Sequence, residues 1–299
     1  MESAVSYLIY NRIKQVEITF PIIKECKPKK LYIIADGPKN EKDSKDCNIC
    51  RKFVESSINW DCEVIKIYSN INLGLAKRTV SALDEVFNYE DRIIFLEDDN
   101  LIDKSFFMFC NNLLEKYSFD NRIFHIGGCN YFEKAIPKSF NYDYIFTARV
   151  SGWGFATWKR AWSKMDLTMK RWDQENKSEF LNKWCIDKKH KQGMMKVFDQ
   201  HCMNKDPWAW SYAWIYACWS NNALSIIPTK NLISNIGFNK SATNTKLNTD
   251  EIVHIPERRN SLKRINHPDK IIRDINFEKN SLRIERNSLW QKLMNKLLK

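Results

Sequence analysis

The sequence lacks the long apolar run that a membrane-spanning helix needs. No stretch of its 299 residues reaches the roughly 18 consecutive apolar residues required to cross a bilayer. The N-terminus carries Glu2 and no leading Lys or Arg before a short apolar run, so it resembles a first strand more than a signal peptide. The nine cysteines are an odd number, and we expect reduced thiols in a cytoplasmic protein.

Two common nucleotide-binding motifs are also missing. Neither G-x-G-x-x-G nor G-x4-G-K-[ST] occurs, which excludes the dinucleotide fingerprint and the P-loop. Cys47 and Cys50 are separated by two residues, with Cys62 nearby, but no second close pair of Cys or His completes a zinc site. The chain has a net charge of +12, yet zinc-finger spacing and RNA-recognition signatures are absent, so nucleic acid is not an expected partner.

Positive charge is concentrated at the C-terminal end. Residues 256–299 contain twelve Lys and Arg against five Asp and Glu. The final stretch, "SLWQKLMNKLLK", is amphipathic, with these residues near one helical face: Leu289, Trp290, Leu293, Leu297 and Leu298. We expect a basic C-terminal extension over residues 251–299 that packs on the domain or makes peripheral contact with the inner face of the membrane.

The first 130 residues alternate short apolar runs with longer amphipathic runs. The apolar runs predict strands over residues 5–9, 31–35, 64–68, 93–96 and 123–127. The amphipathic runs predict helices near residues 12–24, 43–57, 74–88 and 103–117, with Pro21 breaking or kinking the first and Asp103 capping the last. Such alternation predicts an α/β fold with an open, mostly parallel sheet, which binds ligands at the carboxyl ends of its strands.

Polar residues follow four of these predicted strands and should therefore meet at one edge of the sheet. They are Tyr10, Asn11 and Arg12 after the first strand, Asp36 after the second, residues 70–74 after the third, and Glu97, Asp98 and Asp99 after the fourth. An aspartate after the second strand can accept a hydrogen bond from a base N–H. Three adjacent carboxylates repel one another, and a divalent cation held against a diphosphate would make them tolerable.

Aromatic residues are dense in two later segments, "YIFTARVSGWGFATWKRAW" at 144–162 and "DPWAWSYAWIYACW" at 206–219. Indole rings pack cores, and they also stack on the apolar faces of sugars. For each tryptophan taken separately, core packing is favoured. For three of them the sequence also permits a wall around an acceptor sugar: Trp208, Trp210 and Trp214.

Together these segments resemble the nucleotide-diphospho-sugar glycosyltransferases of the GT-A fold. The resemblance rests on Y-N-R, A-D-G-P, N-x-N-L-G and L-E-D-D after the four strands, then "IGGCNYF", "SGWGFATWKRAW" and "NLISNIGFNKSATNT". These features are similar to a bacterial, family 2-like branch. The E-D-D motif followed by a phenylalanine-rich helix is also shared with N-acetylglucosaminyltransferase I. The similarity covers roughly residues 5–247.

The resemblance implies roles for the polar residues at the sheet edge. In these enzymes the acidic motif binds Mn²⁺ or Mg²⁺, which bridges the donor diphosphate, so Asp99 is expected to ligate the metal directly. Asp98 is expected to contact the ribose or donor sugar, and Glu97 to orient the site. Residues expected to contact the base or diphosphate are Tyr10, Asn11, Arg12, Asp36, Gly74 and Lys77, with Arg78 an alternative to Lys77.

The resemblance also implies a catalytic base downstream of the metal motif, for which Asp206 is the best match. Asp166 and Asp173 are competitors, and helix capping is a second role for Asp206. Relatives commonly read A-T-H-T where this chain reads "ATNT". Asn244 therefore replaces a histidine that can complete the metal shell, which shifts the preference towards Mg²⁺, reduces activity or leaves the role to His254.

The sequence therefore predicts a metal-dependent glycosyltransferase that uses a nucleoside-diphosphate sugar, most simply a UDP-sugar. Its acceptor would be a glycan or a lipid-linked glycan in surface polysaccharide synthesis. Residues 1–130 would bind the donor, and residues 131–250 would form the acceptor half of the same domain. Two alternatives stay open: a nucleotidyltransferase, whose usual N-terminal Gly-rich loop is missing, and a binding protein with weakened catalysis.

Overall fold

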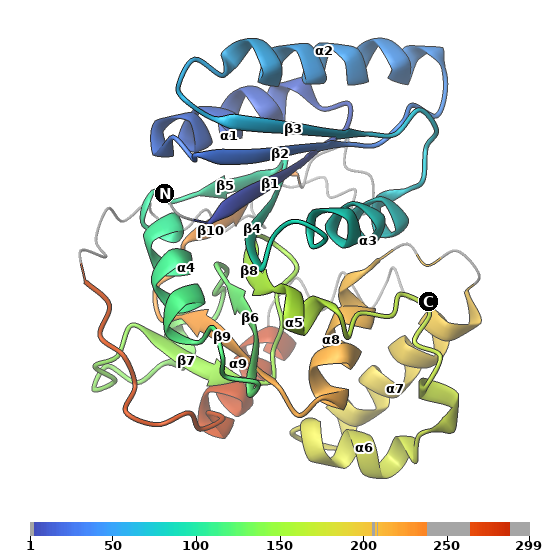
Figure 1. Ribbon diagram of the computed structural model, residues 1–299. Helices are drawn as coiled ribbons and strands as arrows, with labels where there is room; N and C mark the ends of the chain where they lie inside the picture. The colour runs from blue at the N-terminus through green and yellow to red at the C-terminus, as the bar shows by residue number, and fades with distance from the viewer. Residues whose placement is uncertain (1–2, 205–206, 208, 238–263, 288–299) are drawn as a thin grey trace.

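The computed structural model describes residues 3–204, 207, 209–237 and 264–287. Its centre is an eight-stranded sheet with the order β3-β2-β1-β4-β8-β6-β9-β7 (Figure 1). These strands are β1 (Ala4–Ile9), β2 (Lys30–Ala35), β3 (Glu63–Tyr68), β4 (Arg92–Glu97), β6 (Ile123–Gly127), β7 (Tyr144–Thr147), β8 (Phe155–Trp158) and β9 (Leu224–Pro228). A separate two-stranded antiparallel sheet pairs β5 (Asn100–Ile102) with β10 (Ile233–Asn235).

The sheet is parallel through β3, β2, β1 and β4, and again between β6 and β9. Strand β8 runs antiparallel to both β4 and β6, and β7 runs antiparallel to β9. All five strands predicted from the sequence are present, each within one residue of its predicted ends. The residues of β1 are all buried because helices cover both faces there, which explains its continuous apolar run.

Helices cover both faces of the sheet and divide the core in two. One core lies under α1 (Ile13–Cys26), α2 (Glu41–Ser57) and α4 (Ser105–Lys116). The other lies under α3 (Leu75–Val86), α5 (Lys159–Trp162), α6 (Lys177–Trp184), α7 (Lys188–Met203) and α8 (Ser211–Ser220). The predicted α/β fold, an open and mostly parallel sheet flanked by helices, is confirmed.

Two local predictions need correction. Helix α1 continues through Pro21 instead of ending there, because Phe20, Ile22 and Ile23 around it are buried in the core. The N-cap of α4 is Lys104, one residue after the predicted Asp103. The Asp103 carboxylate nevertheless accepts a 2.8 Å hydrogen bond from the backbone N–H of Ser105, so it still satisfies a donor at the start of the helix.

The aromatic-rich segments mainly build the second core. Five of their tryptophans are at most 4% exposed, as are Trp172 and Trp184 between the two segments. The five are Trp158, Trp162, Trp210, Trp214 and Trp219. Trp214 is fully buried and its indole N–H donates to His125, so the expected acceptor wall does not include it. Trp208 lies outside the described residues. The favoured interpretation, core packing, is confirmed for these buried rings.

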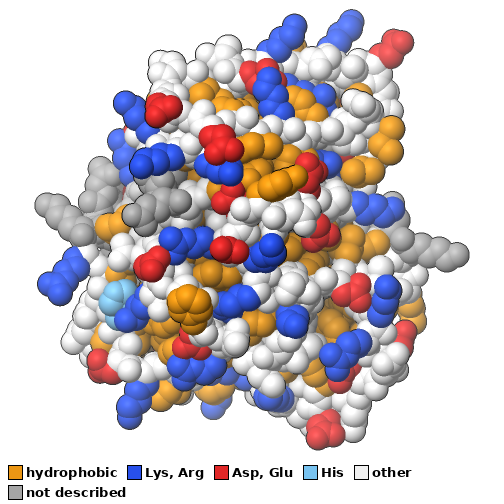
Figure 2. Space-filling view, in the orientation of Figure 1, with side chains coloured by type: hydrophobic (Ala, Val, Ile, Leu, Met, Phe, Trp, Pro, Cys, Tyr) orange, Lys and Arg blue, Asp and Glu red, His pale blue; other side chains and the backbone are white. Residues whose placement is uncertain are grey.

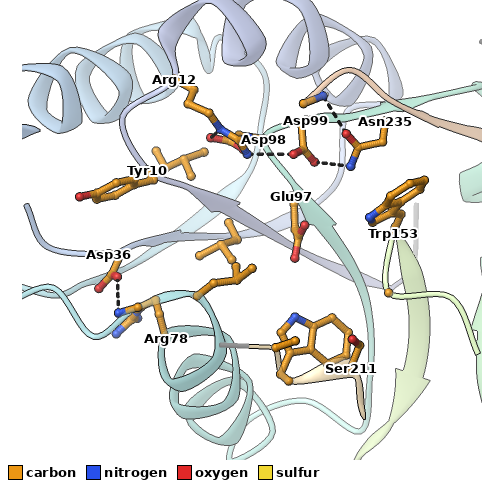
Figure 3. A pocket seen from close by; sticks show the side chains of 18 of the residues that line it. Tyr10, Arg12, Asp36, Arg78, Glu97, Asp98, Asp99, Trp153, Ser211 and Asn235 are labelled. Atoms are coloured by element: carbon orange, nitrogen blue, oxygen red, sulfur yellow. Dashed lines mark hydrogen bonds and ion pairs between the residues drawn. The ribbon is translucent and has the colours of Figure 1, made fainter. Parts of the chain in front are cut away.

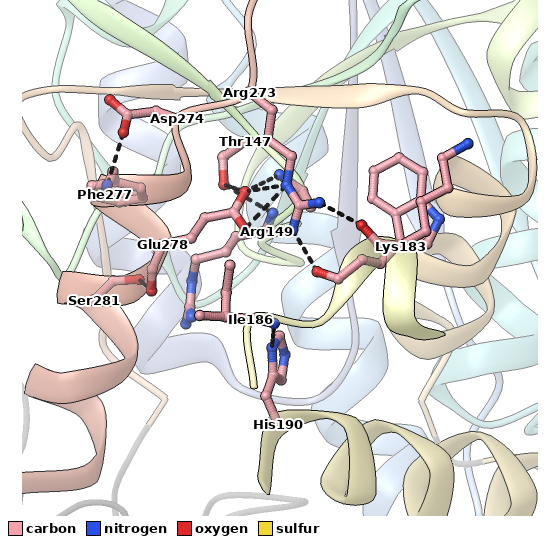
Figure 4. A network of polar contacts seen from close by, with 12 residues as sticks. Thr147, Arg149, Lys183, Ile186, His190, Arg273, Asp274, Phe277, Glu278 and Ser281 are labelled. Atoms are coloured by element: carbon pink, nitrogen blue, oxygen red, sulfur yellow. Dashed lines mark hydrogen bonds and ion pairs between the residues drawn. The ribbon is translucent and has the colours of Figure 1, made fainter. Parts of the chain in front are cut away.

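The C-terminal part is joined to the sheet by a buried ion pair (Figure 4). Glu278 on α9 (Ile275–Asn287) is 2% exposed and accepts hydrogen bonds from the Thr147 hydroxyl at 2.9 Å and the Ala148 backbone N–H at 2.7 Å. It also pairs with Arg273, whose guanidinium donates to the carbonyls of Lys183, at 2.8 Å, and of Trp184. One network therefore ties α9, the edge of the sheet and α6.

None of the described helices has the length and apolarity to cross a bilayer, and the amphipathic stretch near residues 289–298 lies outside the described residues. Figure 2 shows positive and negative side chains interspersed on the face drawn. Cys47, Cys50 and Cys62 are free thiols, and the described part of the chain holds no group of three or more His, Cys, Asp or Glu suited to a metal.

Candidate functional site

The loops after β1, β2, β3 and β4 line one pocket of about 270 Å³, together with residues that precede β8 and begin α8 (Figure 3). The predicted convergence at the carboxyl ends of the strands is therefore observed. The pocket is lined by Leu8, Ile9, Tyr10, Arg12, Asp36, Lys39, Asn72, Gly74, Leu75, Arg78, Glu97, Asp98, Asp99, Gly152, Trp153, Ala209, Trp210, Ser211, Asn235 and Gly237.

The acidic triplet is held by Arg12. The guanidinium contacts the Asp98 carboxylate directly and reaches Oδ2 of Asp99 at 2.9 Å. Strand β4 ends at Glu97, and the next two residues form a turn, so the alternation of side chains along a strand does not extend to the two aspartates. Arg12 therefore acts as a counter-ion to both aspartates in addition to any contact with a ligand.

Asp99 is fixed by residues from a distant part of the chain. Its Oδ1 accepts hydrogen bonds from the side-chain amides of Asn100 and Asn235, each at 3.0 Å. Gly237 passes so close that a Cβ built there would lie 2.3 Å from Oδ2 of Asp99. Asn235 thus belongs to the site. Its segment, "NLISNIGFNKSATNT", carries part of the family resemblance, but no role was predicted for Asn235 itself.

Glu97 keeps a carboxylate inside the pocket (Figure 3). Burial, followed by the nearby charge of Asp99, raises the pKa of Glu97 to about 8. Burial also raises the pKa of Asp99, while Arg12 opposes that shift. Arg12 pairs with Asp98 and Asp99, and burial is the main cause of the raised pKa values of Glu97 and Asp99.

Asp36 anchors the loop between β3 and α3. Its Oδ1 accepts hydrogen bonds from the backbone N–H groups of Gly37 at 2.9 Å and Leu73 at 3.0 Å, and its Oδ2 accepts from Gly74 N–H at 3.0 Å and Asn72 Nδ2 at 3.2 Å. Gly74 has a φ of +77°, which a residue with a side chain rarely adopts, and it is the N-cap of α3. The predicted contact between Asp36 and a base stays a prediction, and one of these donors would have to give way to it.

Tyr10 and Asn11 are both tied to Asp43 on α2. The Tyr10 hydroxyl donates to Asp43 Oδ2 at 2.8 Å, and Asn11 Nδ2 donates to Oδ1 at 3.1 Å. Tyr10 lines the pocket, whereas Asn11 is outside its lining. Asp43 was missed in the sequence because it lies inside a predicted helix, where an acidic residue is usually a solvated surface group.

The structure separates Lys77 from Arg78. Lys77 is exposed on α3 and outside the pocket lining, while Arg78 lines the pocket and is 6% exposed. Arg78 donates to the Ile67 carbonyl at 2.9 Å, its Nε has no hydrogen-bond partner, and no carboxylate of the described residues forms an ion pair with it. Burial lowers the pKa of Arg78. Because the Arg78 guanidinium lines the pocket without an ion-pair partner among the described residues, Arg78 is a better candidate than Lys77 for binding an anionic ligand.

The residues expected to act as the base fall into two groups. Asp206, Asn244 and His254 lie outside the described residues, although Ala209 and Ser211, just beyond Asp206, line the pocket. The competitors are engaged elsewhere. The Asp166 carboxylate accepts hydrogen bonds from Thr168 and Lys170 in a turn, Asp173 pairs with Lys177 at 3.2 Å, and neither aspartate lines the pocket. Lys39 lines it although the sequence gave no reason to select it.

Two carboxylates of the acidic triplet have the oxygen chemistry of ligands for a hard divalent cation, although the described residues hold no group of three or more such ligands. Carboxylate oxygens are the ligands that Mg²⁺ and Mn²⁺ prefer, and Mg²⁺ commonly binds through one or two carboxylates plus substrate phosphates. Arg12 stands beside Asp98 and Asp99 as a cation, so one positive charge faces two paired carboxylates. Asp99 and Glu97 are the residues that would hold the ion.

Comparison with known proteins gives a fold likeness only. No protein-family model matches the chain, and no curated protein matches it. A crystal structure of TarS residues 1–349 from S. aureus is 14% identical with a TM-score of 0.38, over 56% of this chain and 50% of that one. The chain thus spans half the length of TarS in that structure.

A second solved structure, 4-diphosphocytidyl-2C-methyl-D-erythritol synthase from Anaerococcus prevotii DSM 20548, is 11% identical with a TM-score of 0.33. It matches over 58% of this chain and 78% of that one. Both matches extend over little more than half of this chain and score low. The chemistry of the site has to be inferred from its own residues.

Proposed function

We propose that this chain is a metal-dependent glycosyltransferase that uses a nucleoside-diphosphate sugar, with UDP as the nucleotide. The acceptor would be a hydroxyl of a glycan or lipid-linked glycan in surface polysaccharide synthesis. One observation carries the proposal: the four strand-end loops form a single pocket that contains both the acidic triplet, with its two buried aspartates, and the guanidinium of Arg78, which has no ion-pair partner among the described residues. Such a pocket would offer separate sites to a metal and to an anion.

The arrangement of these groups supports an order for the donor along the pocket. Asp36, Asn72 and Arg78 would surround the base and the first phosphate. Asp99 would face the diphosphate, and the sugar would lie beside Glu97 and Trp210. Mn²⁺ or Mg²⁺ bound at Asp99 would neutralise diphosphate charge and favour its departure. Arg12 would keep the aspartates in place whether or not the ion is bound.

The proposed reaction inverts the sugar. The acceptor oxygen forms a bond to the anomeric carbon, the bond from that carbon to the diphosphate oxygen breaks, and the nucleoside diphosphate leaves with the electron pair. A base takes the acceptor proton, and we assign this role to Asp206. An Asp206→Asn variant should bind donor and metal normally, while turnover falls roughly 10²–10⁴-fold. Normal turnover in that variant would remove the assignment.

A thermal-shift screen tests the proposal directly. Purified protein would be heated with nucleoside diphosphates, UDP-sugars, and nucleoside triphosphates paired with sugar phosphates, each with Mn²⁺ and with EDTA. We expect UDP and one UDP-sugar to raise the Tm only with Mn²⁺. The same mixtures would also be assayed for products. Release of pyrophosphate from a triphosphate and a sugar phosphate would instead identify a nucleotidyltransferase. Metal-dependent binding without any turnover would identify a binding protein.

A further inference from the structure

An aromatic pair, Tyr131 and Trp153, stands beside the pocket. Trp153 lines the pocket, and Tyr131, outside the lining, is 41% exposed. The two ring centroids are 5.1 Å apart at an interplanar angle of 82°. Figure 3 places Asp36 and Trp153 towards opposite ends of the pocket, with Glu97 between them. The pair therefore extends the pocket beyond the end that we assign to the transferred sugar.

The backbone holds Trp153 in place. Gly154 has a φ of +52°, and a Cβ built there would lie 2.0 Å from the Ile233 side chain. The Gly154 carbonyl also accepts a 3.0 Å hydrogen bond from the N–H of Gly128. Trp153 thus lies on a loop packed against its neighbours, and a binding surface that is already ordered loses little entropy when a ligand arrives.

Tyr131 shows an apolar ring outside and a polar group inside. Burial of the phenol, then the Cys129 thiol and then the charge of Asp99 raise the pKa of Tyr131. The phenol hydroxyl is therefore the buried end of the side chain, while part of the ring remains exposed. Exposed aromatic faces beside hydrogen-bond acceptors suit a pyranose, which has apolar C–H faces and hydroxyl donors at its edge.

We propose that Tyr131 and Trp153 form the platform for the acceptor sugar, and that this sugar is a neutral pyranose, either a hexose or an N-acetylhexosamine. The inference rests on the proposed function and names its acceptor class. Neutrality follows from charge, because the carboxylates of Asp98 and Asp99 share the single guanidinium of Arg12. A sugar carboxylate placed beside them would be repelled.

The test is saturation-transfer NMR on the full chain, with and without UDP and Mn²⁺. The probes are the methyl glycosides of glucose, galactose and N-acetylglucosamine, with methyl glucuronide as the anionic comparison. We expect saturation transfer to at least one neutral glycoside and none to the glucuronide. Absence of binding by all three neutral glycosides, or equal binding of the glucuronide, would overturn the proposal.

Variants distinguish a loss of sugar contacts at the platform from a general loss of structure. Tyr131→Ala and Trp153→Leu should raise the Kd of the neutral glycoside about 3- to 10-fold, whereas Tyr131→Phe, which keeps the ring, should change it little. Tyr89→Ala is the matched control, because it removes a tyrosine that is 76% exposed in the turn after α3. UDP binding should be unchanged in all four proteins.

Each negative result of these binding experiments leads to a different conclusion. Loss of glycoside selectivity with intact UDP binding refutes the platform alone. If UDP does not bind, the proposed function fails, and the titrations without nucleotide still decide whether the platform binds a neutral sugar. Unchanged glycoside affinity in a correctly folded Tyr131→Ala protein, judged by its Tm, overturns the platform assignment.

Discussion

Asn235 donates a 3.0 Å hydrogen bond to Asp99 although 136 positions separate the two residues in the sequence. The strand that carries Asn235, β10, pairs antiparallel with β5, which directly follows the acidic triplet. The orientation of Asp99 is therefore set by two strands from distant parts of the chain. A local motif at the end of β4 does not suffice to place this carboxylate.

Replacing Asp99 tests the metal site. Asp99→Ala should weaken UDP binding in Mn²⁺ roughly 10- to 100-fold, because a charged ligand of the ion is lost. Isothermal titration with and without EDTA measures this change. Asp120→Ala, which removes a surface carboxylate paired with Arg122, is the control. Undiminished, metal-independent affinity in Asp99→Ala would remove Asp99 from the metal site.

Arg78 and the adjacent Lys77 give a matched pair of variants. Arg78→Gln should weaken UDP roughly 10- to 100-fold, since it removes a buried cation that has no carboxylate partner among the described residues. Lys77→Gln changes an exposed side chain outside the pocket lining and should alter affinity less than about twofold. The same titration measures both, and the reverse ranking would contradict the structural choice between the two residues.

Asp36→Asn should destabilise the protein as well as weaken nucleotide binding. The new amide NH₂ would face backbone N–H donors of the β3–α3 loop, leaving at least one buried donor unpaired. We expect the free energy of unfolding to fall by about 1–3 kcal/mol, measured with urea. Asp61→Asn at an exposed position is the control. Unchanged stability would show that the loop does not depend on this carboxylate.

Glu97 should give the metal-free protein a distinctive pH dependence. Its pKa is raised from 4.5 to about 8 in the folded state, so the folded chain binds this proton more tightly than the unfolded chain does. The associated stability is fully present below about pH 4.5 and is lost as the pH rises towards 8. Urea unfolding from pH 5 to 9 in EDTA should show this decline in the wild type. Glu97→Gln should show a flatter profile, and identical profiles would contradict the shift.

The ion pair between Glu278 and Arg273 should contribute strongly to stability. Arg273→Ala leaves the Glu278 carboxylate, 2% exposed, without its cation, and should cost about 3–5 kcal/mol. Arg122→Ala breaks an exposed pair and should cost less than about 1 kcal/mol. Chemical unfolding measures both. Similar small losses would mean that α9 docks through its apolar residues instead.

The first half of the fold follows closely from the sequence because its signals are local. Apolar runs at residues 5–9 and 93–96 are buried strands, and the polar residues after them meet at one edge, as strand geometry requires. The break that was predicted at Pro21, as an alternative to a kink, is absent because that prediction used only local signals. A local rule predicts a break there, whereas burial of the surrounding helix overrides the lost hydrogen bond.

The parts of the site that escaped prediction depend on contacts between distant residues. The residues near Asn235 in the sequence do not predict its hydrogen bond to Asp99. Lys77 and Arg78 are adjacent and chemically alike, so only the rotation of α3 decides which one lines the pocket. Arg12 could be expected to contact a ligand, but its pairing with both aspartates required the turn after Glu97 to be known.

The position of β8 has a consequence for synthesis on the ribosome. Strand β4 ends at Glu97, yet its outer neighbour β8 begins only at Phe155, and β6 is made in between. At about 5–20 residues per second, the edge of β4 waits roughly 3–12 s for its partner. During that interval β6 must stay off β4, and the open edge can pair with another nascent chain. Translation speed between these two strands should therefore influence the yield of native protein.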